Sequence, residues 1–129
     1  MRIDLNADVG ESYGVYSLGD DSTLMRSVTS VSVATGFHAG DPSVLRRTIR
    51  LARDLGVAIG AHPSFPDLAG FGRREMTLSS EDAEDMVLYQ LAAVSGIARA
   101  EGVAMMHVKP HGALYNMAAR DRQLAESIA

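Results

Sequence analysis

The chain has 129 residues, of which 47% are hydrophobic and 22% are charged, a balance that suits one soluble globular domain with a single buried core. The formal net charge of −4 argues against a nucleic-acid or anionic-membrane surface, so we expect neither kind of partner. The absence of cysteine excludes disulfides, thiolate metal ligands and a thiol nucleophile.

The predicted elements alternate between strands and helices along the chain. Short apolar runs that end in glycine or polar residues predict strands, and apolar residues at helical spacing predict helices. In chain order we expect a strand over residues 2–6, a short helix over 22–28, a strand over 30–35, a helix over 42–55, a strand over 57–61, a loop over 62–78, a helix from 79 or 80 to about 101, a strand over 103–108 and a last helix from 117 or 121.

The two longer helices carry clear start and stop signals. Asp41-Pro42 predicts a helix start, because aspartate is a good N-cap and proline suits the first helical position. Gly56 is placed to end this helix. Ser79 or Ser80 is the expected cap of the next helix, and Gly102 is its expected end.

This order predicts an α/β fold, a TIM-barrel-like (β/α) parallel barrel. The short helix-to-strand connections favour parallel strands joined by right-handed crossovers. Four β/α units make about half of such a barrel, so we expect one domain over residues 1–129 that forms part of a longer barrel. A free half-barrel would expose open sheet edges, so a non-catalytic piece that assembles with other chains is a second interpretation.

The expected cellular location follows from two patterns that the sequence lacks, a signal peptide and a membrane helix. Acidic residues interrupt the N-terminal segment too early for a signal peptide, and no apolar run approaches the roughly 20 residues of a membrane helix. We therefore expect a cytoplasmic protein.

Polar clusters follow the four predicted strands and together contain all four histidines of the chain, which are His38, His62, His107 and His111. The carboxyl ends of parallel strands meet at one rim, where β/α enzymes carry their catalytic groups. The sequence therefore predicts an enzyme-like site at this rim.

The first three clusters contain acids and imidazoles. Asp4, Asn6 and Asp8 share one face of the first strand, with Glu11 beyond it, as either a functional set or a hydrogen-bonded network. His38 precedes a helix whose free N–H groups can hold an anion, or it only stabilises its loop. His62 could be a general base, a metal ligand or a structural side chain, and Asp8, His38 and His62 would make a two-histidine, one-carboxylate metal site if they converge.

Cations dominate the remaining clusters. Lys109 could bind a carboxylate or stabilise developing negative charge, or it could be an exposed surface lysine. Tyr115 and Asn116 lie close to Lys109 and His111 in sequence and could orient a substrate or cap the last helix. Arg73 and Arg74 could clamp a carboxylate or phosphate, although a solvated basic turn explains them equally well.

Five ordered motifs resemble the LamB/YcsF family, which comprises the A subunits of bacterial 5-oxoprolinase. They are DLNADVGE (4–11), GFHAGDP (36–42), GAHPSFPD (60–67), GFGRR (70–74) and VKPHGALYN (108–116). The family usually has Asn and Cys where this chain has Ser32 and Thr35, and because these replacements are small and polar we expect the packing to survive. Family members are about twice this length, so the chain resembles their N-terminal half.

The resemblance implies a TIM-barrel-like fold related to glycoside hydrolase and deacetylase folds. It also implies ATP-dependent opening of the lactam of 5-oxo-L-proline to L-glutamate, with ATP and Mg²⁺ as co-substrate and separate B and C subunits. On this hypothesis the catalytic residues are Asp8, His38, His62 and Lys109. The candidate substrate-binding residues are Asn6, Glu11, Arg73, Arg74, His111 and Tyr115. The alternative is a metal-dependent hydrolase or deacetylase in which Asp8, His38 and His62 hold a divalent ion.

Overall fold

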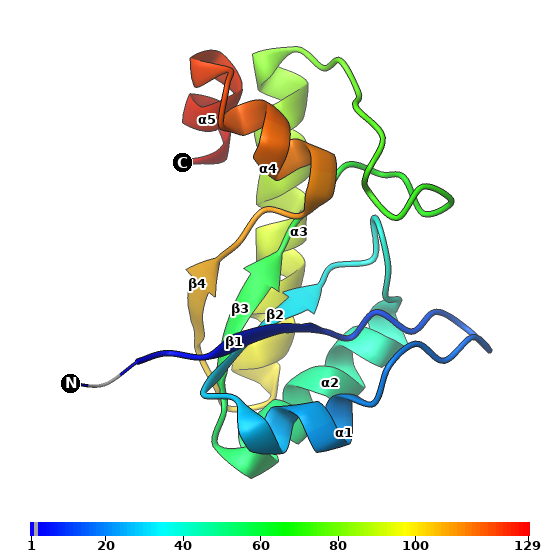
Figure 1. Cartoon of the computed structure of the whole chain (residues 1–129), viewed down its shortest axis with the longest axis vertical. Coiled ribbons are helices and arrows are strands. Elements are labelled where there is room, and N and C mark those ends of the chain that lie inside the picture. Colours follow the sequence, from blue (N-terminus) through cyan, green and yellow to red (C-terminus); the bar gives the residue numbers. More distant parts are fainter. Residues whose placement is uncertain (2) are drawn as a thin grey trace.

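Four parallel strands lie side by side in chain order, from β1 to β4 (Figure 1). The structure is a computed structural model that describes Met1 and residues 3–129. The strands are β1 (Asn6–Val9), β2 (Ser30–Ala34), β3 (Ala58–His62) and β4 (Met105–Val108). The helical elements are α1 (Asp21–Leu24), the 3-10 turn η1 (Met25–Ser27), α2 (Pro42–Leu55), α3 (Ser80–Ala100), α4 (Gly112–Ala118) and α5 (Arg122–Ile128). The predicted α/β class with parallel strands is confirmed.

The long helices begin and end at the predicted signals. The Asp41 carboxylate accepts hydrogen bonds from the backbone N–H groups of Ser43 and Val44, at 2.8 and 2.9 Å, and so caps α2. Gly56 ends α2 in the left-handed conformation, with φ of 69°. The Ser79 hydroxyl accepts from the backbone N–H of Asp82 at the start of α3.

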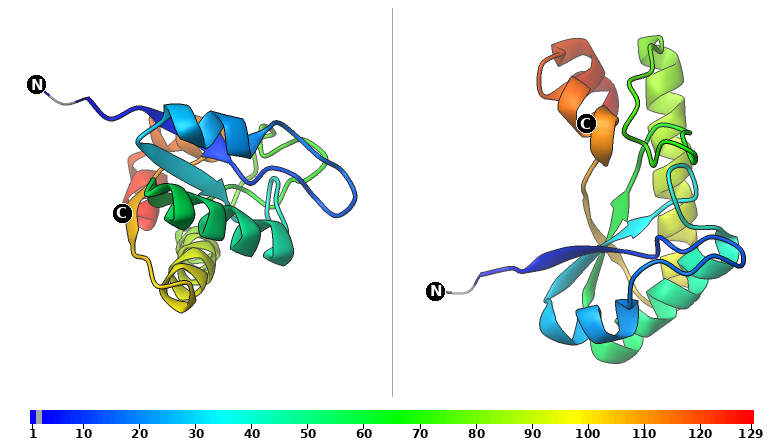
Figure 2. Two further views of the ribbon diagram at one scale, coloured as in Figure 1. Left: turned by 90° about the horizontal axis from the view of Figure 1, so that it is seen from below. Right: turned by 45° about the vertical axis from the view of Figure 1, so that its right-hand side comes forward.

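The apolar core lies between the sheet and the helices α2 and α3, which pack together on one face of the sheet (Figures 1 and 2). Alternate residues of the strands point into it, because side chains of a strand alternate between its two faces. The fully buried core residues of the sheet and the two helices include Val31, Val33, Ile59, Ala61, Leu45, Ile49, Ala52, Val94 and Ala98.

The opposite face of the sheet is polar and concave. Asn6 of β1, Ser32 of β2 and His107 of β4 point to this face, and the Asn6 amide lies 3.3 Å from His107 Nε2. The strands β1 and β4 are not neighbours, so the sheet curves strongly enough to bring their side chains into contact. This curvature is consistent with part of a TIM-barrel-like fold.

The first strand begins later than predicted. We expected it over residues 2–6, but it covers Asn6–Val9, and residue 2 lies outside the described part of the chain. Pairing with β2 starts at Asn6 opposite Ser30. Ile3 and Leu5, whose alternation produced the prediction, are 74% and 56% exposed and lie before the paired segment.

One helix was not predicted. Helix α4 begins at Gly112, directly after His111, whereas no helix was expected before residue 117. Burial of Ala113 and Leu114 against Phe65 and Val87 stabilises this short helix, and the sequence pattern alone does not show those contacts. The last helix follows Asp121 as expected, and none of the described helices is both long and apolar enough to cross a membrane.

Gly60 of β3 is the position where the curved sheet tolerates no side chain. A Cβ atom there would lie 2.2 Å from His107 Nε2, because the imidazole crosses this glycine to reach β1 and β2. We expect Gly60→Ala to lower the free energy of unfolding by about 1–3 kcal/mol, measured by urea denaturation.

The matched control is Gly96→Ala in α3, where a new Cβ would meet nothing within 4 Å. This change should stabilise the chain by about 0.5–1 kcal/mol, because alanine is the better helix former. The double variant Gly60→Ala/His107→Ala should recover part of the lost stability. Equal effects of the Gly60 and Gly96 substitutions would contradict the close approach of His107.

Candidate functional site

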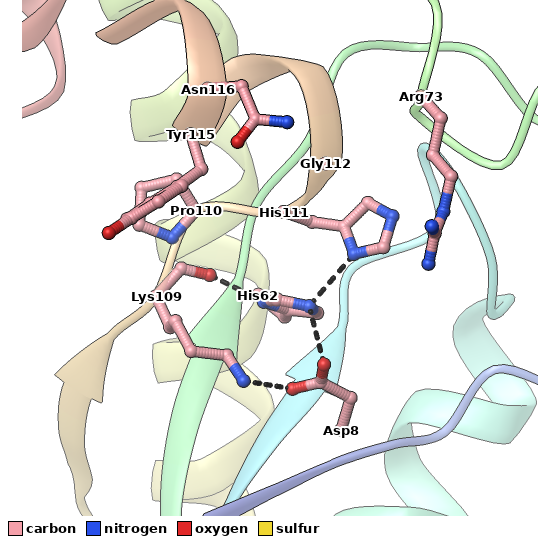
Figure 3. A pocket seen from close by; sticks show the side chains of 9 residues that line it. All are labelled: Asp8, His62, Arg73, Lys109, Pro110, His111, Gly112, Tyr115 and Asn116. Carbon is pink, nitrogen blue, oxygen red and sulfur yellow. Dashed lines mark hydrogen bonds and ion pairs between the residues drawn. The ribbon is translucent and has the colours of Figure 1, made fainter. Parts of the chain in front are cut away.

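A cavity of about 460 Å³ opens at the carboxyl ends of the strands (Figure 3). The strands β1 and β3, the loop after β3, the segment between β4 and α4, and α4 itself contribute to its wall. The lining residues are Asp8, His62, Arg73, Lys109, Pro110, His111, Gly112, Tyr115 and Asn116.

Asp8 and Lys109 form an ion pair across the mouth of the half-barrel. Lys109 Nζ donates to Asp8 Oδ1, and it also lies 3.1 Å from Asn6 Oδ1. Partial burial opposes ionisation of Asp8, but its contacts with the His62 imidazole and the Lys109 ammonium group outweigh it and lower the pKa of this carboxyl. Asp8 is therefore an anion at neutral pH.

His62 lies at the end of β3 between three polar groups. Its Nδ1 is hydrogen-bonded to the backbone carbonyl of Lys109, which can only accept, so Nδ1 carries the proton. In the neutral ring Nε2 then has a free lone pair. This nitrogen lies 3.4 Å from Asp8 Oδ2 and 3.0 Å from His111 Nδ1.

His111 is oriented in the same way by a backbone carbonyl. Its Nε2 lies 2.8 Å from the carbonyl oxygen of Phe71, so Nε2 carries the proton and Nδ1 faces His62. Phe71 has φ of 55°, a left-handed conformation that costs energy for a bulky residue and that is typical of functional sites. Burial lowers the pKa of the His111 imidazole. Phe71 belongs to the GFGRR motif, but no role had been predicted for its carbonyl.

His38 is completely buried beside this pair. Its ring stacks on His111, with ring centroids 3.9 Å apart and planes 7° apart. Neither ring nitrogen of His38 has a hydrogen-bond partner among the described residues. Burial, followed by the neighbouring imidazoles of His111 and His62, lowers the pKa of His38 to about 3, so this ring is neutral.

Glu11 approaches His38 from the other side, with Oε1 3.9 Å from His38 Nε2. It lines a second cavity of about 420 Å³, together with Tyr13, Tyr16 and Phe71. Burial and the charge of Asp8 raise the pKa of the Glu11 carboxyl. Glu11 is thus close to the histidines but outside the main cavity.

The two arginines of the loop after β3 have different environments. Arg73 lines the cavity beside His111, whereas Arg74 donates to the buried carboxylate of Asp67. Asp67 also accepts from the backbone N–H groups of Gly70 and Arg74, and so organises this long loop. The hydrogen bond from Arg74 lowers the pKa of Asp67 to about 2. Arg74 is therefore engaged within the loop rather than in the cavity.

The start of α2 is not free to hold an anion as the sequence had suggested. Asp41 occupies its first N–H groups, and the second oxygen of Asp41 accepts from the backbone N–H of Gly14 at 2.8 Å. This contact attaches the loop after β1 to the helix.

The two positions that depart from the family pattern fit the structure. Ser32 donates to Asn6 Oδ1 at 3.0 Å and lies 3.2 Å from His107 Nε2. Thr35 donates to the fully buried side chain of Gln90 at 2.6 Å. Gln90 in turn bonds the backbone N–H and carbonyl of Ser64, which follows His62 closely. This buried connection between two loops of the site was not predicted.

Most of the predicted site residues come together at one rim. One connected cluster contains Lys109, the acids Asp8 and Glu11, and the histidines His38, His62 and His111. Tyr115 and Asn116 line the cavity beside it. His107 lies deeper, on the polar face of the sheet. The histidines His38, His62 and His111 each offer one nitrogen within 4.8 Å of the others, whereas the predicted metal set contained Asp8 in place of His111.

Comparisons with known proteins agree with the resemblance of the motifs. Residues 3–129 match the model of the LamB/YcsF family. Proteins named as the A subunit of 5-oxoprolinase from Bacillus licheniformis and Bacillus subtilis are 58% and 59% identical over 99% and 100% of this chain, and the match covers 51% and 50% of their lengths. The crystal structure of a lactam utilization protein from Thermus thermophilus superposes with a TM-score of 0.97 at 54% identity, over 99% of this chain and 52% of that protein. The chain thus spans about half the length of the curated relatives it matches.

The Asp67–Arg74 pair predicts how the loop that carries Phe71 and Arg73 responds to acid. The pKa of Asp67 is lowered from 3.8 to about 2, so its contribution to stability is complete above pH 3.8 and is lost as pH falls through about 2. The free energy of unfolding of the wild-type chain should therefore fall between about pH 4 and about pH 2. Asp67→Asn and Arg74→Gln should each make this fall smaller, as measured by urea denaturation.

Arg99→Gln is the matched control, because this exposed arginine of α3 has no carboxylate partner among the described residues. It should keep the wild-type response to acid. An unchanged response in the Asp67 variant would contradict the assignment.

Proposed function

The chain belongs to the LamB/YcsF family, and on that premise we propose that it acts in the A subunit of an ATP-dependent 5-oxoprolinase. The proposed reaction opens the lactam of 5-oxo-L-proline to L-glutamate, with ATP and Mg²⁺ as co-substrate. Because the chain covers about half of its relatives, the remaining half and the partner B and C subunits are part of the proposal.

One observation carries the proposal. A proton acceptor, a carboxylate and two cations line a single cavity at the rim where parallel β/α proteins carry out chemistry. His62, Asp8, Lys109 and Arg73 come from four separate segments, and all four side chains point toward this cavity (Figure 3). The names of the similar proteins support a lactam as the substrate.

The cavity suits a small cyclic amide that carries a carboxylate. The Arg73 guanidinium can hold the substrate carboxylate with two parallel hydrogen bonds. Tyr115 and Asn116 line the same cavity and can contact the ring and its amide. Lys109 lies beside Asp8, where its ammonium group can stabilise negative charge that develops on the reacting carbonyl.

A lactam resists hydrolysis because resonance makes its carbonyl carbon weakly electrophilic. We propose that the γ-phosphoryl group of ATP is transferred to the lactam oxygen, with release of ADP. Water then attacks the activated carbon, the carbon–nitrogen bond breaks and the ring nitrogen takes up a proton. A second water hydrolyses the resulting acyl phosphate to the carboxylate and inorganic phosphate.

His62 is the best placed general base for the attacking water. Its Nδ1 is committed to the Lys109 carbonyl, which leaves Nε2 as the proton acceptor on the side of the cavity. The Asp8 carboxylate, 3.4 Å from Nε2, stabilises the imidazolium that forms. His38 supports this arrangement by packing against His111.

The test is ATP-dependent release of glutamate from 5-oxoproline, with and without the B and C subunits. Alanine at Asp8, His38, His62 or Lys109 should lower turnover in the assembled complex at least about a hundredfold, with folding checked by circular dichroism. Leu88→Ala, on the exposed surface of α3, is the control and should keep wild-type turnover. Wild-type rates in all four variants would overturn the assignment.

The adjacent arginines provide a sharper test of substrate binding. Arg73→Gln should raise KM for the lactam about tenfold or more, which corresponds to the loss of a charged hydrogen bond worth about 1.5 kcal/mol. Arg74→Gln removes the same charge one residue away, but Arg74 is paired with Asp67, so KM should change much less. An equal rise in KM for both variants would show that the loop, and not Arg73 itself, determines binding.

A further inference from the structure

We propose that the outer face of α3 binds the same face of a second copy of this chain, so that two chains associate through antiparallel α3 helices. Helix α3 lies on the outside of the molecule (Figure 2), and its buried residues, including Val87 and Val94, point toward the rest of the chain. We define the outer face by its exposed residues, which are Asp85, Leu88, Tyr89, Ala92, Ser95, Gly96 and Arg99. This inference concerns association alone and does not depend on the lactam reaction.

The first argument is the apolar character of a face that is open to water. None of residues 86–98 is charged, although a surface helix usually carries charged residues on its outer side. Leu88 and Tyr89 are 60% and 66% exposed. Phe37 supports the Tyr89 ring from one side, with ring centroids 5.9 Å apart. An exposed apolar patch with charges only at its two ends is typical of an interaction surface.

The second argument is the position of the two charges, which makes the face complementary to itself. Asp85 lies seven residues before Ala92 and Arg99 lies seven residues after it, so each charge is about 10 Å from the centre along the helix axis. Neither charged group has an ion-pair partner among the described residues. In an antiparallel pair centred on Ala92, Asp85 of each copy faces Arg99 of the other, whereas a parallel pair would bring like charges together. Because one face supplies both members of each pair, the partner is a second copy related by a two-fold axis.

The third argument is the match of large and small side chains in the same register. Leu88 of one copy lies opposite Ser95 of the other, Tyr89 lies opposite Gly96, and Ala92 meets its own equivalent at the axis. A Cβ on Gly96 would meet nothing within 4 Å, so the space above this residue is open to an aromatic ring. Small residues at these positions allow the two helices to approach to about 8 Å.

The spacing along the helix supports the same pairing. Asp85, Leu88, Ala92, Ser95 and Arg99 follow one another at alternating intervals of three and four residues, which places them in the seam of a coiled coil. Side chains at such positions all point to one partner helix. The outer face therefore fits a helix that runs along α3 rather than a partner that touches it at one point.

The size of the face limits the strength of the dimer. Standard protein interfaces bury about 1,600 Å², and one helix face from each copy is smaller, so we expect a reversible dimer with a Kd of about 10–100 µM. Below about 1 µM this dimer dissociates, so unfolding and turnover measured on dilute protein report the chain without its second copy. None of the outer-face residues lines the cavity that contains His62 and His111. The dimer therefore leaves that cavity open.

The experiment is sedimentation equilibrium of the full chain at concentrations from about 1 to about 500 µM. Asp85→Arg and Arg99→Asp should each raise the Kd of self-association at least about tenfold, because each change turns two attractive pairs into two repulsive pairs. An equimolar mixture of the two variants should associate with about wild-type affinity, because every pair in the mixed dimer again joins opposite charges. Arg26→Asp, an exposed arginine outside α3, is the matched control and should keep the wild-type Kd.

A second variant tests the register at the two-fold axis. The chain contains no cysteine, so a single introduced thiol reports one position only. Ala92→Cys should form a disulfide-linked dimer under mild oxidation with copper phenanthroline, because the two equivalent residues meet at the axis within the reach of a disulfide. Ala119→Cys, at an exposed position after α4, is the control and should cross-link at least about tenfold more slowly.

Three results would overturn the proposal. The wild-type chain could remain a monomer at about 500 µM, which would leave the outer face to a partner of different sequence. Both charge variants could associate as tightly as the wild type, which would show that copies meet elsewhere, such as at the edges of β1 and β4. The Ala92 and Ala119 variants could cross-link at equal rates. Association is measured without substrate, so its failure is distinct from a failure of lactam turnover.

Discussion

The contact between Asp8 and Lys109 is the constraint on which the site depends, because it joins the first strand of the sheet to the residue that directly follows the last strand. Neighbouring strands lie about 4.8 Å apart, so β1 and β4 would be about 14 Å apart in a flat sheet. Their side chains meet only because the sheet curves, and the curvature requires little bulk on the inner face of the middle strands. Ser32 and Gly60 meet this requirement, and the Asn6–His107 contact repeats the same connection one layer deeper.

The site combines strong polar contacts with two energetically unfavourable features, a buried unpaired histidine and a strained backbone conformation. Asp8 and Lys109 form an ion pair, and the outer ring nitrogens of His62 and His111 are hydrogen-bonded to backbone carbonyls. In contrast, His38 is buried without a partner among the described residues, and Phe71 is strained. Such features persist only where the surrounding structure enforces them, and here the buried Gln90 and the Asp67–Arg74 pair hold the adjoining loops. Gln90 and the Asp67–Arg74 pair thus stabilise the loops, whereas the residues at the rim are the ones available for chemistry.

The proposed reaction depends on the orientation of His62. The Lys109 carbonyl fixes Nδ1 of this ring as a hydrogen-bond donor. Nε2 is therefore the nitrogen that can accept a proton from water.

Local sequence alone determined the helix α2, with its aspartate cap and terminal glycine, and the order of parallel strands that brings polar residues to one rim. It also identified the residues that converge there, since period-two alternation and strand ends follow from short-range rules. Only the tertiary structure decided the start of β1, the existence of α4, and the different partners of Arg73 and Arg74, which are adjacent and chemically identical. It alone decided that His111 joins His38 and His62, because that contact depends on sheet curvature and on a carbonyl from a distant loop, which no local pattern encodes.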